Sequence, residues 1–418
     1  MRTQSSGLGR SAGCPPGVAA GAIVASIVAA SCGAHTSSPP MPDAGLDGAV
    51  EIDASHVGVD AGEEPEEHPE LCPRPPGAWQ VETAVVPEFD DFYLWCLAAS
   101  DETVIIALRD GPTLQAAVRG SDGWSTSIVD PTELAVGPTC ATSPDGAVWL
   151  AYAGVDHFLR VATLHDGVWE ARAVLEVSEV LFPSLAFGLD GEMHVSHYWL
   201  SGNGESALRY SRSRGVAWET TTLDDRAFVG QFSAIAVDSE GRAHVVHASS
   251  PSFEAPRELL HSVHVGDEWR SSMVFAPDDE FPAGLALGPE GAAHIVFWRN
   301  HQESAGPYHA ARQGGTWLVE LVDADNSILG ATGQEQPLAV DVRGNVHLAY
   351  TFSEDGGHNT EVRYATNESG AWQTETIASG GVVGFALDPM GQAHVALGGL
   401  ANGAYEVRHA WREAEPCP

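Results

Sequence analysis

Short apolar runs separated by turn residues recur along most of the chain, most clearly in the stretch 337–379. This stretch contains an apolar run, a D-x-x-G turn, a G-x-x-H-V-type strand, a polar loop, a strand ending near R-Y-A, a turn and a Trp-led strand. Short runs of this kind, bounded by Gly, Asn, Asp and Ser, are typical of β-strands. No copy has the extended 3.6-residue periodicity of an amphipathic helix, so the pattern predicts an all-β protein.

The copies align on two features, a Trp at the start of the last strand and a turn glycine. The Trp occurs seven times, at Trp79, Trp124, Trp169, Trp218, Trp269, Trp317 and Trp372. The glycine occurs six times, with Glu102 at its place in a degenerate first copy; the six are Gly146, Gly191, Gly241, Gly291, Gly344 and Gly391. A spacing of roughly 44 to 55 residues matches a four-stranded propeller blade. The sequence therefore predicts a seven-bladed β-propeller over residues 77–418.

The Trp and glycine series are out of phase, which predicts how the ring closes. Trp79 precedes the first turn, whereas the seventh copy ends without a Trp-led strand of its own. The segment GAWQVETAVV at 77–86 nearly repeats GAWQTETIAS at 370–379. We therefore expect the N-terminal strand to complete the last blade and to remove two free sheet edges.

Two pairs of cysteines lie where disulfides could connect parts of the ring. Cys72 lies just before the closing strand and Cys417 just after its expected neighbour, so we expect a disulfide between them in an oxidising compartment. Cys96 and Cys140 occupy equivalent places, six residues before the turn position, in blades 1 and 2. These two could bridge adjacent inner strands, or the ring could hold equivalent positions too far apart. The sequence leaves both outcomes open.

The N-terminal region has the features of an export signal followed by a tether. Within residues 1–31, Arg2 and Arg10 form a positive n-region, and 18–30 is an Ala-rich apolar stretch too short to span a bilayer. Residues 32–76 are rich in Pro, Gly, Asp and Glu and hold no aromatic residue. Such a segment cannot bury enough apolar surface to fold, so we expect a disordered, extended tether.

The end of the signal resembles a bacterial lipobox. Small residues precede a cysteine in Ala29-Ala30-Ser31-Cys32, although Ala29 stands where that motif usually has Leu. The resemblance implies acylation of Cys32, and Gly33 after it fits an outer-membrane lipoprotein facing the periplasm or the cell surface. Cleavage near Ala30, which would release a secreted protein, is the alternative.

The charge balance limits the classes of partner that this protein is expected to bind. The chain has 57 acidic and 20 basic residues, a net charge of −37. Such a surface repels phosphate backbones and anionic lipid, so we expect no nucleic-acid partner and no membrane contact beyond the lipid anchor. It suits cations, basic proteins or neutral sugars, and it also simply keeps a secreted protein soluble.

Several residue types repeat once per blade and have a structural explanation. A His follows the turn glycine by three residues in five copies: His194, His244, His294, His347 and His394. Because these lie on different blades, they could share one metal ion only in the central channel. We therefore interpret them as packing and hydrogen-bonding elements between blades. The Trp residues, the turn aspartates, the small Ala of each first strand and the repeated Arg160, Arg209, Arg363 and Arg408 are interpreted in the same way.

Together these repeats resemble bacterial propeller repeats grouped with the sialidase-type Asp-box (BNR) and NHL repeats, over residues 77–413. An Asp box has the pattern S-x-D-x-G-x-x-W, whereas the segment 143–149 has its Gly one place early. The resemblance implies the fold. No catalytic residue carries over, because the three arginines of a sialidase site have no counterparts that stand apart from the repeats.

Function is expected where the copies differ, in loops held by a rigid ring. Connections between blades share one face with those between second and third strands, and three of them repeat an acidic–aromatic pattern. Such loops could hold Ca²⁺, bind sugars by stacking and hydrogen bonding, or dock a basic protein. The alternative is that these acidic loops form a hydrated surface that binds no ligand. The candidate ligand-face residues are Asp90, Asp91, Phe92, Asp224, Asp225, Asp278, Asp279, Glu280, Trp199 and Trp298.

Three functions fit this sequence. The first is a non-enzymatic module that binds protein or glycan through the acidic loop face. The others are a glycoside hydrolase or polysaccharide lyase using paired carboxylates, and a scaffold subunit of an envelope assembly. Because the chain has no G-x-S-x-G, H-E-x-x-H, Walker or C-x-x-C motif, we favour binding over catalysis. We expect no cofactor except, on the acidic loops, a calcium ion.

Overall fold

The computed structural model describes most of the residues between 77 and 412, all within the unit Glu70–Pro418. Only the backbone is described at 92–95, 136, 175, 281–283 and 401. The residues between 77 and 412 that lie outside the description are 89–91, 101–102, 112, 132–135, 176–179, 202, 227–228, 230–231, 251, 253–256, 276–280, 300–304, 324–336, 354–358 and 402–403.

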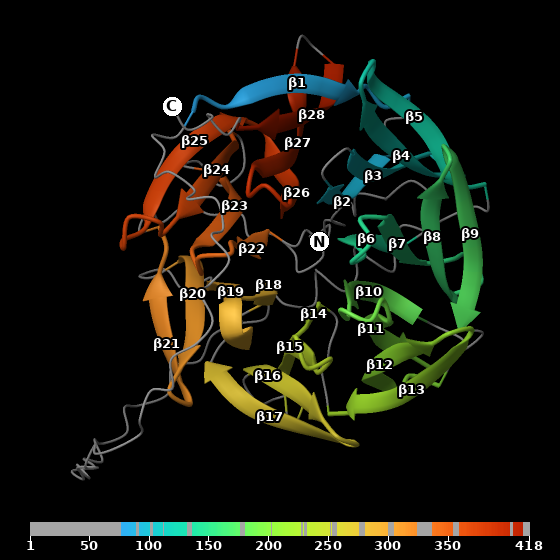
Figure 1. Ribbon diagram of the computed structural model, residues 1–418, viewed down its shortest axis with the longest axis vertical. Helices are drawn as coiled ribbons and strands as arrows, with labels where there is room; N and C mark the ends of the chain where they lie inside the picture. Colours follow the sequence, from blue (N-terminus) through green and yellow to red (C-terminus); the bar gives the residue numbers. More distant parts are fainter. Residues whose placement is uncertain are drawn as a thin grey trace, which may run out of the picture. The chain divides into compact units, whose positions relative to one another are not determined.

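The strands form seven four-stranded antiparallel sheets arranged as the blades of a ring (Figure 1). From the inner to the outer strand, blade 1 consists of β2 (Phe92–Ala99), β3 (Val104–Asp110), β4 (Thr113–Gly120) and β5 (Gly123–Asp130). Blade 2 consists of β6 (Val136–Thr142), β7 (Val148–Ala153), β8 (Leu159–His165) and β9 (Val168–Leu175). Blade 3 consists of β10 (Val180–Phe187), β11 (Met193–Leu200), β12 (Ser206–Arg214) and β13 (Ala217–Asp224). Blades 4 and 5 are β14 (Ala234–Val237), β15 (Ala243–Ser249), β16 (Glu258–Val265), β17 (Glu268–Phe275); and β18 (Phe281–Leu287), β19 (Ala293–Arg299), β20 (Gly306–Gln313), β21 (Thr316–Leu321). Blades 6 and 7 are β22 (Leu338–Val340), β23 (Val346–Phe352), β24 (Glu361–Thr366), β25 (Gln373–Ser379); and β26 (Gly381–Leu387), β27 (Ala393–Ala401), β28 (Ala404–Trp411), β1 (Gln80–Val85).

This architecture confirms the predicted seven-bladed propeller. Helix is limited, in the described part of the chain, to a single 3-10 turn at Pro289–Gly291. A helix of the length and apolar character that a membrane crossing requires is not found among the described residues.

The N-terminal strand closes the ring as predicted. β1 pairs with β28 antiparallel, with Gln80 opposite Trp411 and Val81 opposite Ala410. The seventh sheet consequently has the order β1-β28-β27-β26, so its outermost strand comes from the opposite end of the chain (Figure 1). β28 would otherwise present an unpaired edge, and β1 covers it.

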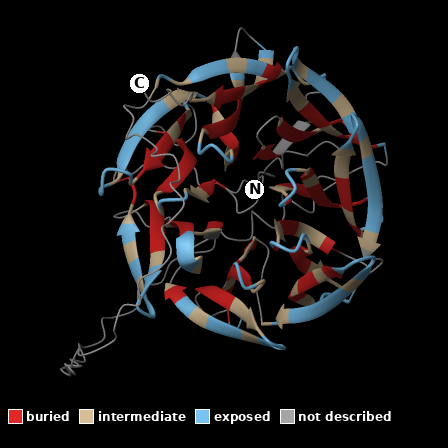
Figure 2. Ribbon diagram, viewed as in Figure 1, coloured by how far each residue is buried: buried red, intermediate tan, exposed pale blue. Residues whose placement is uncertain are grey.

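The core lies between the blades, and this explains the apolar pattern of the strands. In β3, Ile106, Ala107 and Leu108 are fully buried in succession, because neighbouring blades cover both faces of an inner strand. The outer strand β21 instead alternates between exposed and half-buried residues, since one of its faces meets solvent. Figure 2 shows the same division around the ring, with exposed residues concentrated on the outer strands.

Cys96 and Cys140 form a disulfide that joins β2 of blade 1 to β6 of blade 2, with their Cα atoms 5.7 Å apart. Both residues are buried, at 2% and 3% exposure. The structure thereby decides the alternative that the sequence left open: the innermost strands lie nearest the ring axis, where adjacent blades are close enough for a disulfide. The predicted Cys72–Cys417 pair lies outside the described residues.

The repeated His and Trp residues pack one blade against the next. In blade 4, His244 Nδ1 lies 3.1 Å from His261 Nε2, and the His261 ring meets Trp317 of blade 5 edge-on at 5.2 Å. Each set therefore runs from a second-strand His through a third-strand ring to the Trp of the next blade, as the structural interpretation predicted. The equivalent sets are His194–Tyr210–Trp269, His294–His309–Trp372, His347–Tyr364–Trp79 and His394–His409–Trp124.

Candidate functional site

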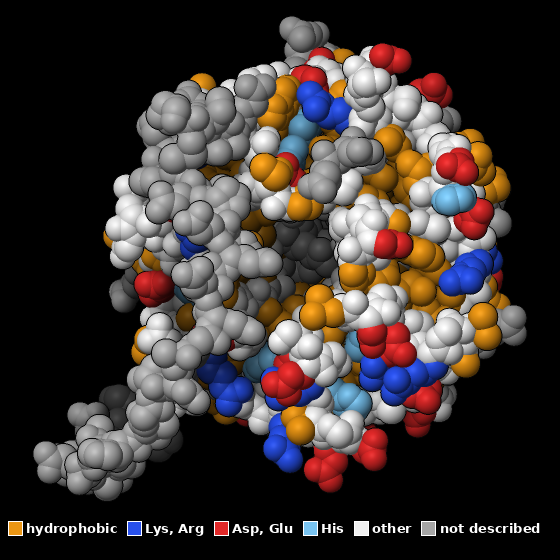
Figure 3. All heavy atoms as spheres, viewed as in Figure 1, with side chains coloured by type: hydrophobic (Ala, Val, Ile, Leu, Met, Phe, Trp, Pro, Cys, Tyr) orange, Lys and Arg blue, Asp and Glu red, His pale blue; other side chains and the backbone are white. Residues whose placement is uncertain are grey.

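A cavity of about 1390 Å³ follows the inner strands and extends outward between blades 6 and 7. Figure 3 shows the central hollow of the ring, with hydrophobic side chains around it. The wall includes the small first-strand residues Ala98, Ala141, Ala186, Ala236, Ala339 and Ala386. Small side chains at this point keep the centre of the ring open.

Polar side chains border the outward part of this cavity, which we name the blade 6–7 mouth. They come from the turns 341–345 and 388–392, which each join a first strand to a second, and from the 367–372 connection between third and fourth strands. The first residues of β25 and the residue that follows β28 complete them. In a meandering blade these connections share one face, opposite the loops that join blades. The mouth is lined by Asp341, Arg343, Asn345, Glu368, Gln373, Glu375, Gln392 and Arg412.

Asp341 is held in place by its own turn. Its Oδ1 accepts hydrogen bonds from the backbone N–H groups of Arg343 and Asn345 at 2.9 and 2.8 Å, and its Oδ2 accepts from Asn345 Nδ2 at 2.8 Å. Gly344 has a φ of 87°, a conformation that glycine adopts without steric cost. Burial raises the pKa of Asp341, but the nearby His347 and these hydrogen bonds outweigh burial and lower it to about 2. Asp341 is therefore ionised at neutral pH.

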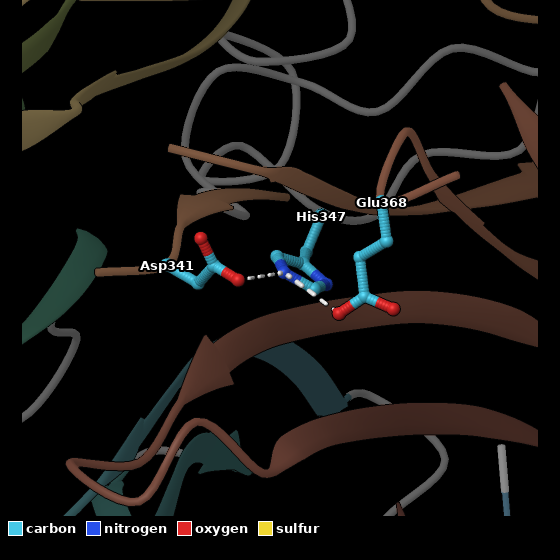
Figure 4. Close-up of side chains that lie close together, drawn as sticks. All are labelled: Asp341, His347 and Glu368. Atoms are coloured by element: carbon cyan, nitrogen blue, oxygen red, sulfur yellow. Dashed lines mark ion pairs between the residues drawn. The ribbon is translucent and has the colours of Figure 1, made fainter. Parts of the chain in front are cut away.

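Three ionisable side chains converge at the mouth: Asp341 from the turn, His347 from β23 and Glu368 from the connection after β24 (Figure 4). His347 Nε2 lies 3.6 Å from Asp341 Oδ2 and 3.9 Å from Glu368 Oε1. His347 is 3% exposed, and its Nδ1 is hydrogen-bonded to Tyr364 Oη, which fixes the ring. Its Nε2 has no hydrogen-bond partner within the described part of the chain. The group is thus arranged as a set of potential metal ligands.

Among the described residues, blade 6 differs from the other blades in having a second carboxylate beside its His–Asp pair. The His–Asp pair itself recurs, with His244 Nε2 3.2 Å from Asp238 Oδ2 and His394 Nε2 3.5 Å from Asp388 Oδ2. Glu368, by contrast, stands four residues before the repeated Trp and is the acidic member of that series. The corresponding residues in blades 1 to 5 are Gly120, His165, Arg214, Val265 and Gln313.

The sequence analysis assigned Asp341 and His347 to repeating structural positions and overlooked Glu368. The signal was available in the same alignment on the Trp, as a single acidic residue in a series of neutral and basic ones. The third-to-fourth-strand turns lie on the face opposite the connections between blades, where the sequence placed the candidate ligand-binding loops.

The side chains of four predicted ligand-face residues are described: Asp224, Asp225, Trp199 and Trp298. The Asp224 carboxylate, 9% exposed, is hydrogen-bonded to His247 Nε2 at 3.2 Å and to Arg226 at 2.9 Å. Burial raises the pKa of Asp224, but the hydrogen bonds from His247 and Arg226 bring it far below its usual range. Asp224 therefore fastens the connection after β13 to blade 4, whereas Asp225 is exposed.

The two tryptophans of that prediction are engaged in packing. Trp298 is buried, with its ring 6.0 Å from that of Tyr350 in the next blade. One face of Trp199 is covered by the guanidinium group of Arg209, 3.8 Å from the ring centre. The remaining predicted residues lie outside the described side chains: Asp90, Asp91, Phe92, Asp278, Asp279, Glu280 and the lipidation site Cys32.

A second, smaller hollow of about 490 Å³ lies between blades 4 and 5. Its lining includes Arg242, Arg270 and Arg312. Arg242 is paired with Asp238 and Glu240, at 2.6 and 3.0 Å. This hollow has a more basic lining than the blade 6–7 mouth, although both border the face of the first-to-second-strand turns.

No protein-family model matches the chain, and no curated protein matches it. Solved structures share its fold at low identity. One described as an ulvan lyase from a new family of polysaccharide lyases is 11% identical with a TM-score of 0.52, covering 80% of this chain and 94% of that chain. A protein of unknown function from Dyadobacter fermentans is 14% identical (TM-score 0.49; 68% and 96% covered), and an Aleuria aurantia lectin variant is 13% identical (TM-score 0.45; 70% and 98% covered). The match to the ulvan lyase agrees with the propeller fold of this chain.

Proposed function

We propose that this propeller is a non-enzymatic binding module for carbohydrate and that the ligand occupies the blade 6–7 mouth. The observation that carries the proposal is the mixed rim, in which the amides of Asn345, Gln373 and Gln392 stand among carboxylates and arginines above an apolar wall. A sugar hydroxyl both donates and accepts hydrogen bonds, so a rim that offers both functions suits it.

A basic protein fits this rim less well than a sugar does. Arg343 and Arg412 stand among its carboxylates, and Arg412 forms an ion pair with Glu375. Cationic side chains of a partner would be repelled by these guanidinium groups, whereas hydroxyl groups would not. The ulvan lyase with a similar fold is named for a polysaccharide, and the proposal agrees with that name without depending on it.

Binding is also favoured over lyase activity. His347 and Tyr364 at the mouth are residue types that serve in acid–base catalysis. The same hydrogen-bonded pair, however, recurs in blade 3 as His194 and Tyr210, 2.6 Å apart, away from the mouth. Because blade packing explains the pair in both places, it does not identify an active site.

Calorimetric titration of the full chain tests the proposal, with a panel of neutral and uronate-containing oligosaccharides as ligands. We expect Gln392→Ala and Gln373→Ala each to weaken binding about fivefold, the loss of one hydrogen bond of about 1 kcal/mol. Two control substitutions, Arg270→Ala in the second hollow and Asp225→Asn on the opposite face, should leave the affinity unchanged.

The alternatives give different results in the same experiment. Weaker binding in Asp225→Asn, with Gln392→Ala unaffected, would move the ligand to the acidic loop face. Release of unsaturated sugar products would show a lyase. Binding to none of the oligosaccharides would overturn the carbohydrate proposal and leave a protein partner or a scaffold role.

A further inference from the structure

We propose that Asp341, His347 and Glu368 form a binding site for a divalent transition-metal ion, best suited to Zn²⁺, that opens toward the blade 6–7 mouth. The site is independent of the carbohydrate proposal, because its ligands come from this chain alone. The observations that carry it are a buried imidazole nitrogen, the two carboxylates that face it and the distances among the three side chains.

The unpartnered atom is His347 Nε2. It is buried and has no hydrogen-bond partner among the described residues, although two carboxylates face it. A buried polar atom without a partner is destabilising. The equivalent His194 Nε2 of blade 3 also has no partner among the described residues, but only His347 belongs there to a group of three potential ligands. A metal ion would supply the missing partner. The hydrogen bond between Nδ1 and Tyr364 would then serve as the outer contact that orients a ligating imidazole.

The distances suit an ion between the three side chains. Zinc bonds of about 2.0–2.2 Å place two ligands of a tetrahedral ion roughly 3.4 Å apart. The imidazole nitrogen lies 3.6 Å from one carboxylate oxygen and 3.9 Å from the other, and all three ligand atoms lie within 4.8 Å of one another. Glu368 is 55% exposed, so its side chain is free of core packing and small rotations would complete the geometry.

The ligand types favour zinc over calcium or magnesium. Two carboxylate ligands suit the charge of a divalent ion, and an imidazole is a ligand that zinc accepts readily. Calcium and magnesium prefer oxygen ligands throughout. Three protein ligands leave a fourth position open, and the exposure of Glu368 places this position on the side of the mouth. Water or a ligand oxygen would fill it.

The repeat supplies a matched comparison. In blade 4, Asp238 approaches His244 at 3.2 Å from the equivalent turn, and Val265 stands where blade 6 has Glu368. A hydrogen bond between one His and one Asp would serve blades 4 and 6 alike. A metal ion requires the third ligand and therefore distinguishes them.

Metal titration of the full chain without a polyhistidine tag, treated with chelator and kept free of sugars, tests the site. We expect one Zn²⁺ per chain by calorimetry, with Ca²⁺ unable to compete. Co²⁺ bound in its place should show the visible absorption of a low-coordinate site. Glu368→Gln should weaken Zn²⁺ binding by about tenfold or more, since losing even an outer-sphere contact typically costs 10–100-fold. Glu368 is half-exposed, so this variant should fold normally.

Asp238→Asn in blade 4 is the control and should leave Zn²⁺ affinity unchanged. The proposal is overturned if no stoichiometric Zn²⁺ or Co²⁺ binds, or if Glu368→Gln binds both ions as tightly as the unaltered chain does. Equal weakening by Asp238→Asn would also contradict it, because the effect would then belong to the fold. Since no sugar is present, failure of the metal site and failure of carbohydrate binding are separate results.

Discussion

Buried histidines make the stability of this propeller depend on pH, because burial keeps them neutral in the folded chain. Burial removes water from the imidazole groups, and this lowers the pKa of His261 and of His409 to about 3 and that of His294 to about 4. An unfolded His has a pKa near 6.5. At mildly acidic pH, the unfolded chain therefore binds protons at these histidines that the folded chain does not bind.

We expect the free energy of unfolding to fall as the pH drops from 7 to 5. Between pH 6.5 and the folded values of about 3 to 4, each such His favours the unfolded state by up to about 1.4 kcal/mol per pH unit. Urea unfolding at pH 7, 6 and 5 measures this. Protonation of the acidic surface would relieve repulsion and act in the opposite direction. Rising stability on acidification would therefore contradict the prediction.

At the scale of the elements, the junction between blades 7 and 1 depends on one side chain of the closing strand. Glu82 Oε1 on β1 accepts hydrogen bonds from Trp124 Nε1 at 2.8 Å and Arg119 Nε at 2.7 Å, both in blade 1. Burial raises the pKa of Glu82, but the hydrogen bonds from Trp124, Arg119 and His409 together lower it below its usual range. At the next junction, the equivalent contact is a single bond from Trp169 to Ser127 at 3.0 Å.

Glu82→Ala should therefore destabilise the ring by about 2 kcal/mol, because it removes two hydrogen bonds to a half-exposed carboxylate, both of them charge-assisted. Ser127→Ala is the matched control and should cost about 1 kcal/mol, since it loses one neutral bond. Urea midpoints of the two variants measure the difference. Equal losses would mean that the closing junction is no more dependent on its polar contacts than an ordinary one.

The Cys96–Cys140 disulfide links two blades across 44 residues of sequence. Closing a loop of that length in the unfolded chain stabilises the fold by about 4 kcal/mol on the chain-entropy account. The double substitution Cys96→Ser, Cys140→Ser should lower the free energy of unfolding by a similar amount. Denaturant unfolding of this variant beside the oxidised parent measures it. An unchanged midpoint would show that packing alone holds the first two blades together.

At the scale of the whole molecule, we propose that a lipid anchor at Cys32 and the tether 32–76 hold the propeller at the cell envelope, with secretion as the alternative. Cys32→Ser should abolish incorporation of a labelled fatty acid and move the protein from the membrane fraction to the soluble exported fraction. Cys14→Ser is the control and should change neither. Soluble, unlabelled parent protein would support plain signal cleavage instead.

The blade 6–7 mouth and Asp225, one of the predicted acidic-loop residues, lie on opposite faces of the ring. The mouth borders turns within the blades, whereas Asp225 follows β13 in the connection to the next blade. The two binding hypotheses therefore separate cleanly in space. A ligand at one face leaves substitutions at the other without effect, which is why Asp225→Asn and Gln392→Ala discriminate between them.

The sequence by itself determined the ring, its seven blades and the strand that closes it. Strand periodicity and turn chemistry are local, and each appears several times, so a degenerate copy such as the one containing Glu102 does not obscure the period. Closure followed from the same repeat, because the segment 77–86 matches the strand that the last copy lacks. The structural roles of the repeated His and Trp followed from their spacing.

Tertiary structure alone decided the contacts on which function depends. The Cys96–Cys140 disulfide exists because inner strands converge at the axis, a distance that sequence spacing does not fix. Asp224 appears as an available carboxylate in the sequence, yet the fold places it against buried His247. Glu368 gains its meaning only where a turn brings it beside His347, since the position of a ligand is set by distances in space and not by order in the chain.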